Sequence, residues 1–247
     1  SFRFVGLWIV HFFRAGSIQL AGIKFKDVKR GNIMNCTRES MLLYAVTDRT
    51  WTGDRTLEQQ VEEALKGGVT FLQLREKRLG QEEFLEEARR IKDLAAFYHV
   101  PFVINDNVDI AAAIDADGVH VGQEDMEAGQ VRKKLGPSKI IGVSAHTVEE
   151  ALRAEKMGAD YLGVGAVFST STKGDAKVLR REELKAICQA VSIPVVAIGG
   201  IKEENLGELK GSGVSGVAVV SGIFGAKDIT GACKRLLDKS REMTGGK

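Results

Sequence analysis

The chain has 247 residues, 44% of them hydrophobic and 28% charged, which is typical of a globular protein and excludes a disordered chain or a membrane bundle. The net charge is +2, but residues 1–40 carry seven Lys or Arg and two Asp or Glu, which leaves 28 basic and 31 acidic side chains after them. The body therefore has no basic excess that would indicate nucleic-acid binding.

Residues 1–40 precede the first predicted strand. Residues 5–13 (VGLWIVHFF) are apolar but far shorter than the roughly 20 residues that span a bilayer. A signal peptide is the alternative, because Arg3 precedes this stretch and small residues follow it. Met34 and Met41 both lie close to the first strand, so we expect residues 1–40 to be an extension outside the fold and residues 41–247 to be one domain.

From residue 42 onward, short apolar runs alternate with longer amphipathic stretches such as 57–66 and 82–98, which is typical of parallel βα units. The predicted strands number eight, at 42–47, 70–75, 101–105, 118–121, 139–144, 161–165, 194–199 and 216–221. Eight units in about 250 residues predict a closed (β/α)8 TIM barrel. In such barrels the chemistry lies at the carboxyl ends of the strands.

The predicted strand 70–75 leads into a polar segment, residues 73–77 (QLREK). Side chains alternate along a strand, so Gln73, Arg75 and Lys77 point together toward the barrel mouth while Leu74 points toward the helices. Two cations and an amide can bind a polyphosphate, Arg with a planar fork and Lys with a point charge. The alternative is a solvated strand end whose charges lie in water.

Acidic side chains follow the next two predicted strands. Asn105 and Asp106 end the strand 101–105, and Asp125 comes shortly after the strand 118–121. Mg²⁺ prefers a few protein carboxylates and completes its octahedron with water and phosphate oxygens, so the two aspartates predict a magnesium site. Helix capping by either aspartate is the competing role.

Small and hydroxyl-bearing residues gather after the last three predicted strands. The loop 169–174 ends with Lys173 and could close over a charged substrate, with an ordinary polar surface loop as the alternative. Gly199-Gly200 is predicted to open the helix after the seventh strand, and residues 220–222 (VSG) lie at the end of the eighth. Backbone N–H groups at these two places often bind a phosphate in barrels. The residues around the barrel mouth thus form two groups that could each bind an anion, which predicts two anionic substrates.

Segments spread over the predicted barrel resemble, in order, the motifs of the thiamine-phosphate synthase family. They are YAVTD (44–48), QLREK (73–77), IND (104–106), DGVHVGQED (117–125), GVSAHT (142–147), STSTK (169–173), AIGGI (197–201) and VAVVSGI (217–223). The resemblance covers residues 41–247, and residues 1–40 match nothing in it. One departure is Gly222, where the family's pattern leads us to expect alanine.

The resemblance implies a transferase of thiamine biosynthesis that couples a hydroxymethylpyrimidine pyrophosphate to a thiazole phosphate, plain or carboxylated, and releases pyrophosphate. It assigns the pyrophosphate to Arg75, Lys77, Asn105 and Lys173, and Mg²⁺ to Asp106 and Asp125. It assigns the pyrimidine to Gln73 and Ser144, and the thiazole phosphate to Thr170, Thr172, Gly200, Val220 and Ser221. Because the aminopyrimidine can stabilise a positive charge on its methylene group, pyrophosphate can leave before the thiazole nitrogen attacks, and no general base is required.

Two alternatives remain at this stage. A thiazole tautomerase of the same fold would need an acid-base group, for which His146 or His120 is the candidate, but it would have no use for Arg75, Lys77 and the two aspartates. A non-catalytic binder of thiazole or thiamine phosphate would keep the glycine-rich phosphate site and lose the carboxylates or Lys173. Three isolated cysteines and the absence of a membrane-length segment lead us to expect a cytoplasmic protein. The sequence leaves open whether it forms a homo-oligomer.

Overall fold

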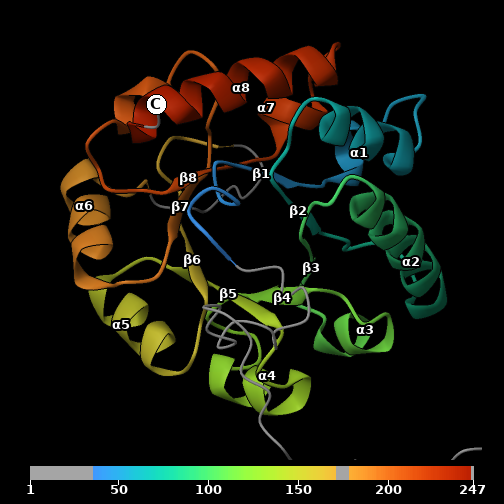
Figure 1. The fold of residues 1–247 in the computed structure, drawn as a ribbon, viewed down its shortest axis with the longest axis horizontal. Coiled ribbons are helices and arrows are strands. Elements are labelled where there is room, and N and C mark those ends of the chain that lie inside the picture. Colours follow the sequence, from blue (N-terminus) through green and yellow to red (C-terminus); the bar gives the residue numbers. More distant parts are fainter. Residues whose placement is uncertain (1–35, 171–177, 246–247) are drawn as a thin grey trace, which may run out of the picture. The chain divides into compact units, whose positions relative to one another are not determined.

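The computed structural model describes residues 36–170 and 178–245. Within them, eight parallel strands follow one another around a closed barrel in sequence order, and the last strand pairs with the first (Figure 1). The strands are β1 (Leu43–Val46), β2 (Phe71–Leu74), β3 (Phe102–Asn105), β4 (Gly118–Val121), β5 (Ile140–Ala145), β6 (Tyr161–Gly165), β7 (Val195–Ile198) and β8 (Gly216–Val219). The predicted TIM barrel is confirmed.

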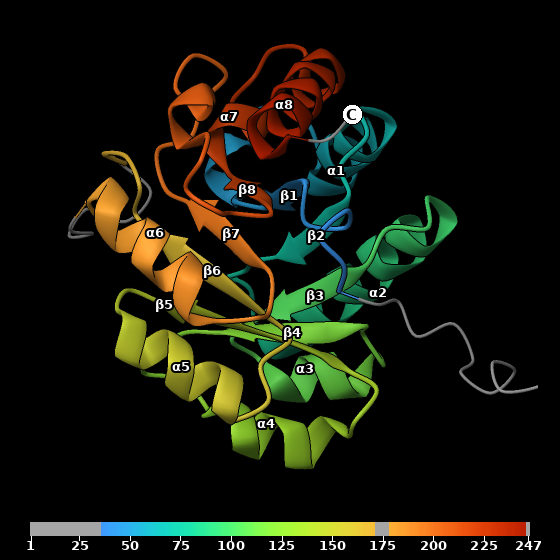
Figure 2. The same ribbon diagram turned by 60° about the vertical axis from the view of Figure 1, so that its left-hand side comes forward.

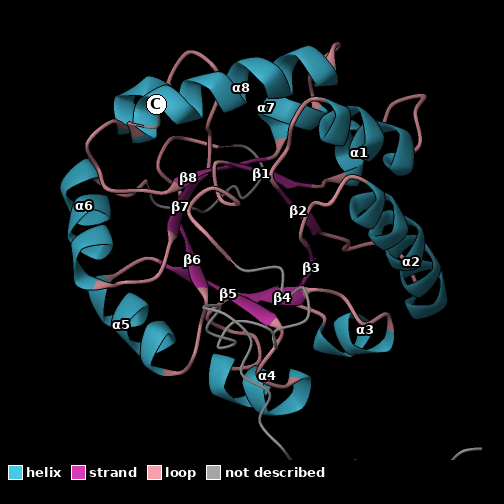
Figure 3. Cartoon of the chain, viewed as in Figure 1, coloured by secondary structure: helices cyan, strands magenta, loops and turns pink. Residues whose placement is uncertain are grey.

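Helices surround the strands, as Figures 2 and 3 show. They are α1 (Leu57–Lys66), α2 (Gln81–Phe97), α3 (Val108–Ala113), α4 (Ala128–Leu135), α5 (Val148–Lys156), α6 (Arg181–Ala190), α7 (Ser221–Phe224) and α8 (Ile229–Thr244), with 3₁₀ turns η1 (Arg49–Trp51) and η2 (Leu206–Leu209). The described helices include none long and apolar enough to cross a bilayer.

Side-chain caps explain where several of these helices begin. The side chain of Thr56 accepts a hydrogen bond from Gln59 N, and the Gln59 side chain returns one to the Thr56 backbone, so α1 starts with a capping box. Asn107 and Thr147 cap α3 and α5 in the same local way. Such caps satisfy N–H groups that have no partner within the helix.

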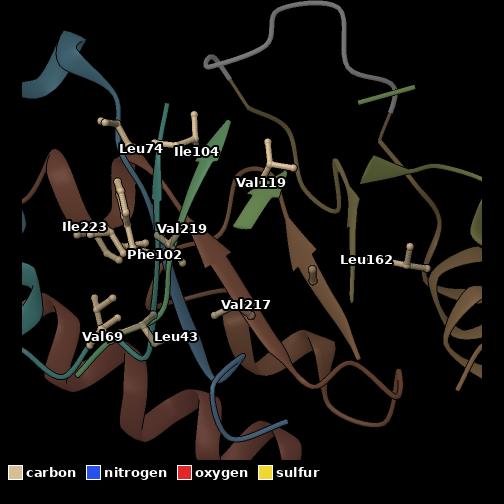
Figure 4. Packing of buried hydrophobic residues seen from close by; sticks show 14 of the residues in the cluster. Leu43, Val69, Leu74, Phe102, Ile104, Val119, Leu162, Val217, Val219 and Ile223 are labelled. Atoms are coloured by element: carbon tan, nitrogen blue, oxygen red, sulfur yellow. The ribbon is translucent and has the colours of Figure 1, made fainter. Parts of the chain in front are cut away.

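Alternation along the strands divides the core into two parts. Leu43 and Ala45 face the helices and belong to the large outer cluster, part of which Figure 4 shows around Leu43, Val217 and Val219. Tyr44 and Val46 face the barrel interior, where they join a smaller cluster of buried residues. The outer cluster supplies most of the buried apolar surface, while the inner one forms the floor beneath the site.

Two local predictions are wrong. Gly199-Gly200 does not open a helix: both residues have positive φ, 101° and 65°, and the chain runs on to the short turn η2. The eighth strand ends at Val219 and not at residue 221, because Val220 leaves the extended conformation (φ −107°, ψ −86°) and Ser221 starts α7. At Gly199-Gly200 the positive φ values favour a tight turn, which explains why no helix begins there.

Residues 1–35 lie outside the described residues, so the expected extension stays a prediction. Cys36 packs against the interior cluster that contains Met41 and Tyr44. Thr37 and Ser40 form a local turn in which Ser40 N donates to Thr37 Oγ1 at 3.2 Å and Thr37 N donates to Ser40 Oγ at 3.0 Å. The segment just before β1 thus contacts the barrel.

Candidate active site

A cavity of about 220 Å³ opens at the carboxyl ends of the strands. Every predicted site residue that the structure describes lines it: Gln73, Arg75, Lys77, Asn105, Asp106, Asp125, Ser144, Thr170, Gly200, Val220 and Ser221. Thr172 and Lys173 lie outside the described residues, so their places stay predictions. The closed barrel thus brings together residues that are spread over most of the sequence.

The end of β2 carries the predicted amide and cations. Gln73 is nearly buried, at 4% exposure, and faces the interior, whereas Leu72 and Leu74 pack in the outer cluster, as alternation predicts. Arg75 Nη1 lies 3.1 Å from Asp48 Oδ2. Burial disfavours the charge on Asp48, but hydrogen bonds from Thr50 and the positive charge of Arg75 outweigh burial and lower the pKa of that carboxyl.

A buried carboxylate holds the backbone that carries Lys77. Glu76 Oε1 accepts hydrogen bonds from Lys77 N at 2.7 Å and Arg78 N at 2.6 Å, and Glu76 Oε2 lies 2.8 Å from Arg49 Nε. Arg49 also reaches Glu87 Oε1 at 2.6 Å. Burial opposes the charge on Glu76, yet these backbone and Arg49 hydrogen bonds outweigh it and lower its pKa. The sequence reasoning missed this clamp.

The two aspartates reach the cavity from neighbouring strand ends. Asp106 Oδ2 lies 2.5 Å from Lys77 Nζ and accepts from Asn105 Nδ2 at 2.6 Å, while Asp125 Oδ2 accepts from Gly122 N at 2.7 Å. Neither residue is a helix cap, since Asn107 and Glu127 occupy those positions, so the competing role is wrong. In both carboxylates Oδ1 has no hydrogen-bond partner among the described residues.

These donors suit Mg²⁺. Within the described ranges no group of three or more His, Cys, Asp or Glu side chains is arranged to hold a metal. Two carboxylates beside the cations Arg75 and Lys77 match an ion that keeps several waters and takes only one or two protein carboxylates. Among the described residues, this part of the cavity has too few carboxylates to coordinate an ion with protein ligands alone.

The opposite side of the mouth is built from small residues after β7 and β8. A Cβ added at Gly200 would lie 2.3 Å from Ser169 O and 2.8 Å from Phe168 Cβ. Asn205 Nδ2 donates to Gly200 O at 2.9 Å and holds this turn in place. Val220 is the N-cap residue of α7, and Ser221 begins the helix. Ile223 N already donates to Val220 O at 3.1 Å, so only the N–H groups of Ser221 and Gly222 lack a partner within the helix.

The two histidines considered for acid-base chemistry have different surroundings. His120 is buried in the floor, with Nδ1 3.0 Å from Tyr161 Oη and Nε2 3.0 Å from Ser144 Oγ. The His146 side chain is 56% exposed, and its Nδ1 lies 3.2 Å from Glu150 Oε2 on α5. Tyr161 and Tyr44, which the sequence reasoning did not single out, complete the floor. Both occupy strand positions whose side chains point into the barrel, and the alternation of side chains along a strand could have identified them.

Comparison with known proteins gives consistent matches. The family model described as thiamine monophosphate synthase matches residues 43–223. The thiamine-phosphate synthase of Clostridium acetobutylicum is 53% identical over 196 residues, which cover 79% of this chain and 93% of that protein. Thiamine-phosphate synthase 2 of Streptococcus pneumoniae is 46% identical over 202 residues, or 82% of this chain and 96% of that protein. The solved thiamine phosphate pyrophosphorylase from Pyrococcus furiosus superposes with a TM-score of 0.77 at 42% identity, covering 83% of this chain and 98% of that one.

Proposed function

The chain belongs to the thiamine monophosphate synthase family, as its motifs predict, and we propose how its residues make thiamine phosphate from a pyrimidine pyrophosphate and a thiazole phosphate. The observation that carries this proposal is that one cavity is lined both by Arg75, Lys77 and the two aspartates and by the glycine-rich turn at Gly200. One cavity can hold two anionic substrates with their reacting ends together.

The pyrophosphate binds at the ends of β2 and β3. Arg75 and Lys77 supply two positive charges, and Asn105 Nδ2 supplies a neutral donor. Asp48 orients Arg75 through its 3.1 Å contact, and Glu76 fixes the backbone on either side of Lys77. Because these groups are set before the reaction starts, they stabilise the charge that develops on the departing pyrophosphate. Lys173 is expected to add a further charge to this set.

Asp106 and Asp125 are the residues that would hold Mg²⁺. When bound, the ion neutralises pyrophosphate oxygens and so makes the pyrophosphate a better leaving group. The two Oδ1 atoms that lack partners among the described residues are the oxygens we expect to face it. Lys77 pairs with Asp106 at 2.5 Å, and we expect its ammonium group to turn to the phosphate oxygens when the substrate binds.

The thiazole phosphate binds on the other side of the mouth. Backbone N–H groups in the turn at Gly200 and at Ser221, the first residue of the short α7, suit a phosphate, because successive N–H groups in a turn form a concavity that binds anions. Ser221 supplies a hydroxyl there, and Thr170 and Thr172 are expected to supply further ones. The pyrimidine ring lies between the two anionic groups, against Gln73 and Ser144.

The reaction breaks the bond between the pyrimidine methylene and the pyrophosphate oxygen, and it forms a bond between that methylene and the thiazole nitrogen. The leaving pyrophosphate takes the electron pair of the broken bond, and the thiazole nitrogen supplies its own lone pair for the new one. No proton has to leave the nucleophile. His146 lines the exposed edge of the cavity and pairs with Glu150, but this reaction needs no acid-base role from it.

The test is direct. Purified protein with both substrates and Mg²⁺ should release pyrophosphate and form thiamine phosphate in equal amounts. Omitting either substrate, or adding excess chelator, should abolish release. A folded protein that releases no pyrophosphate under these conditions would contradict the proposal.

A further inference from the structure

Hydrogen bonds link five side chains in one continuous row across the barrel floor. Gln73 Nε2 donates to Tyr44 Oη at 2.5 Å, and the hydroxyls of Tyr44 and Tyr161 lie 2.6 Å apart. Tyr161 Oη lies 3.0 Å from His120 Nδ1, and His120 Nε2 lies 3.0 Å from Ser144 Oγ. The two ends of the row are the residues expected to contact the pyrimidine. The middle three have no part in the function proposed above.

A glycine on β5 leaves the room in which the middle residues of the row meet. Gly142 lies in register between His120 on β4 and Tyr161 on β6. A Cβ at Gly142 would lie 2.1 Å from Tyr161 Cζ and 2.5 Å from His120 Nδ1. Because β5 leaves this space open, the two side chains meet across it. Gly163 likewise leaves room beside the His120 ring, where a Cβ would lie 3.1 Å from Cε1.

Burial and the number of available protons determine which group donates each hydrogen bond in the row. Burial raises the pKa of both Tyr44 and Tyr161, so each hydroxyl keeps its single proton. Since Tyr44 accepts from Gln73, it donates to Tyr161, which donates to His120 Nδ1, and His120 Nε2–H then donates to Ser144 Oγ. The opposite order leaves the Tyr44 proton without an acceptor among these contacts, although Tyr44 is only 1% exposed, and such an unsatisfied buried group is costly.

The direction defines what the ends of the row present to the cavity. Gln73 uses its amide nitrogen within the row, so its carbonyl oxygen remains an acceptor. Ser144 accepts within the row, so its hydroxyl remains a donor. Both residues line the cavity, whereas Tyr161 does not. Tyr161 can therefore influence a ligand only through its neighbours.

We propose that Tyr44, Tyr161 and His120 are positioning residues that fix the polarity of Gln73 and Ser144, so that the site selects a heterocycle that offers an N–H donor to Gln73 and a ring-nitrogen acceptor to Ser144. This rests on the proposed function, because the aminopyrimidine presents that pattern through its 4-amino group and adjacent ring nitrogen. The 4-oxo analogue presents the reverse pattern, a carbonyl acceptor beside a ring N–H donor.

The experiment measures equilibrium binding of the 4-amino and 4-oxo forms of the pyrimidine pyrophosphate to the full chain by calorimetry, with Mg²⁺ and without thiazole. Both ligands carry the same pyrophosphate, so the ratio of their affinities reports the heterocycle edge. The unaltered chain should prefer the amino form by about 100-fold or more, since a site built on polar contacts rejects a mismatched analogue strongly. Tyr161→Phe removes only the central hydroxyl and should reduce this preference to about tenfold, a loss equal to one hydrogen bond.

Two comparisons separate positioning from packing. The Phe71 ring packs 4.6 Å from that of Tyr44 and 5.5 Å from that of Tyr161 but carries no hydroxyl, so Phe71→Leu should disturb the floor and keep the preference. Tyr44→Phe interrupts the same row and should match Tyr161→Phe, which also provides a second variant if one fails to fold. The double variant should lose no more preference than either single one, because one break is enough.

The outcomes distinguish this proposal from the function on which it rests. A folded Tyr161→Phe protein with unchanged preference, or a Phe71→Leu protein with an equal loss, would overturn the positioning role. So would an unaltered chain that binds both forms equally. An unaltered chain that binds neither form would instead contradict the proposed function.

Discussion

Lys77 Nζ lies 2.5 Å from Asp106 Oδ2, so a cation expected to hold pyrophosphate and a carboxylate expected to hold Mg²⁺ are paired with each other. Their side chains are 52% and 27% exposed, and an exposed pair of this kind contributes at most about 1 kcal/mol. The ion pair therefore opposes only weakly the separation of Lys77 from Asp106 when a substrate binds. It keeps both charges at the mouth while leaving them available to a metal-bound substrate.

Asp106→Asn should reduce turnover by about 100-fold or more, because it removes one of the two carboxylates proposed to hold Mg²⁺ beside the leaving group. Asn tolerates the positive φ of 60° at this position. The measurement is pyrophosphate release as a function of Mg²⁺ concentration, and the concentration for half-maximal rate should rise. Asp115→Asn is the matched control, since Asp115 also has positive φ, 54°, but its side chain is 80% exposed and pairs with Lys139. An unchanged Mg²⁺ dependence in Asp106→Asn would remove the metal assignment.

Gly200→Ala should raise the KM for thiazole phosphate by about tenfold, the equivalent of one hydrogen bond, and change the KM for the pyrimidine substrate much less. The added Cβ would lie 2.3 Å from Ser169 O, so the turn whose backbone N–H groups are proposed to bind the phosphate must shift. Gly211→Ala separates this clash from backbone strain, because Gly211 also has positive φ, 80°, with open space around its Cβ position. Equal effects on both KM values would place the thiazole phosphate elsewhere.

Glu76→Gln should lower the free energy of unfolding at pH 7 by about 1–3 kcal/mol, because a neutral amide oxygen replaces the charged acceptor of hydrogen bonds from Arg49 and two backbone N–H groups. The folded pKa of Glu76 is lowered, since hydrogen bonds from Arg78 N, Arg49 and Lys77 N outweigh burial. Its stabilisation is therefore complete above the ordinary Glu pKa of about 4.3 and is lost as the pH falls through the lower folded value.

Denaturant unfolding at several pH values measures this difference. The gap in stability between the unaltered chain and Glu76→Gln should narrow as the pH falls below about 4. Glu82→Gln, on the exposed face of α2, should show no comparable gap. Glu76→Gln should also lower turnover, because a neutral amide oxygen holds the N–H groups of Lys77 and Arg78 less strongly than the carboxylate does. A gap that widened in acid would contradict the sign assigned to Glu76.

Deletion of residues 1–33 should leave both turnover and melting temperature unchanged, because the barrel strands and every described site residue lie after Met34. Deletion of residues 1–40 should lower the melting temperature by about 2–4 °C, the shift expected for roughly 1 kcal/mol in a domain of this size. The longer deletion removes Cys36 from the interior cluster and the turn between Thr37 and Ser40. Thermal unfolding of the two truncated chains distinguishes the cases, and collapse of the shorter deletion would show that residues 1–33 belong to the fold.

The sequence alone determined the eight βα units and which strand side chains face the barrel interior or the helices. Both follow from local periodicity, which depends only on neighbouring residues along the chain. The inward position of Gln73 and the positions of Arg75 and Asp106 at strand ends follow from the same rule. Local reasoning failed at Gly199-Gly200, where positive φ turns the chain away from a helix, because glycine permits several backbone conformations and its neighbours do not select one.

Only the tertiary structure decided which of these side chains meet. Tyr44 and Tyr161 are 117 residues apart in sequence, and their contact exists because the strands close into a barrel. Tyr161 also meets His120, because Gly142 leaves the space between β4 and β6 open. The clamp of Glu76 with Arg49, and the pairing of Lys77 with Asp106, likewise join residues that no local pattern relates. Closure of the sheet sets these distances, so hydrogen bonds and charges across the mouth depend on packing as a whole.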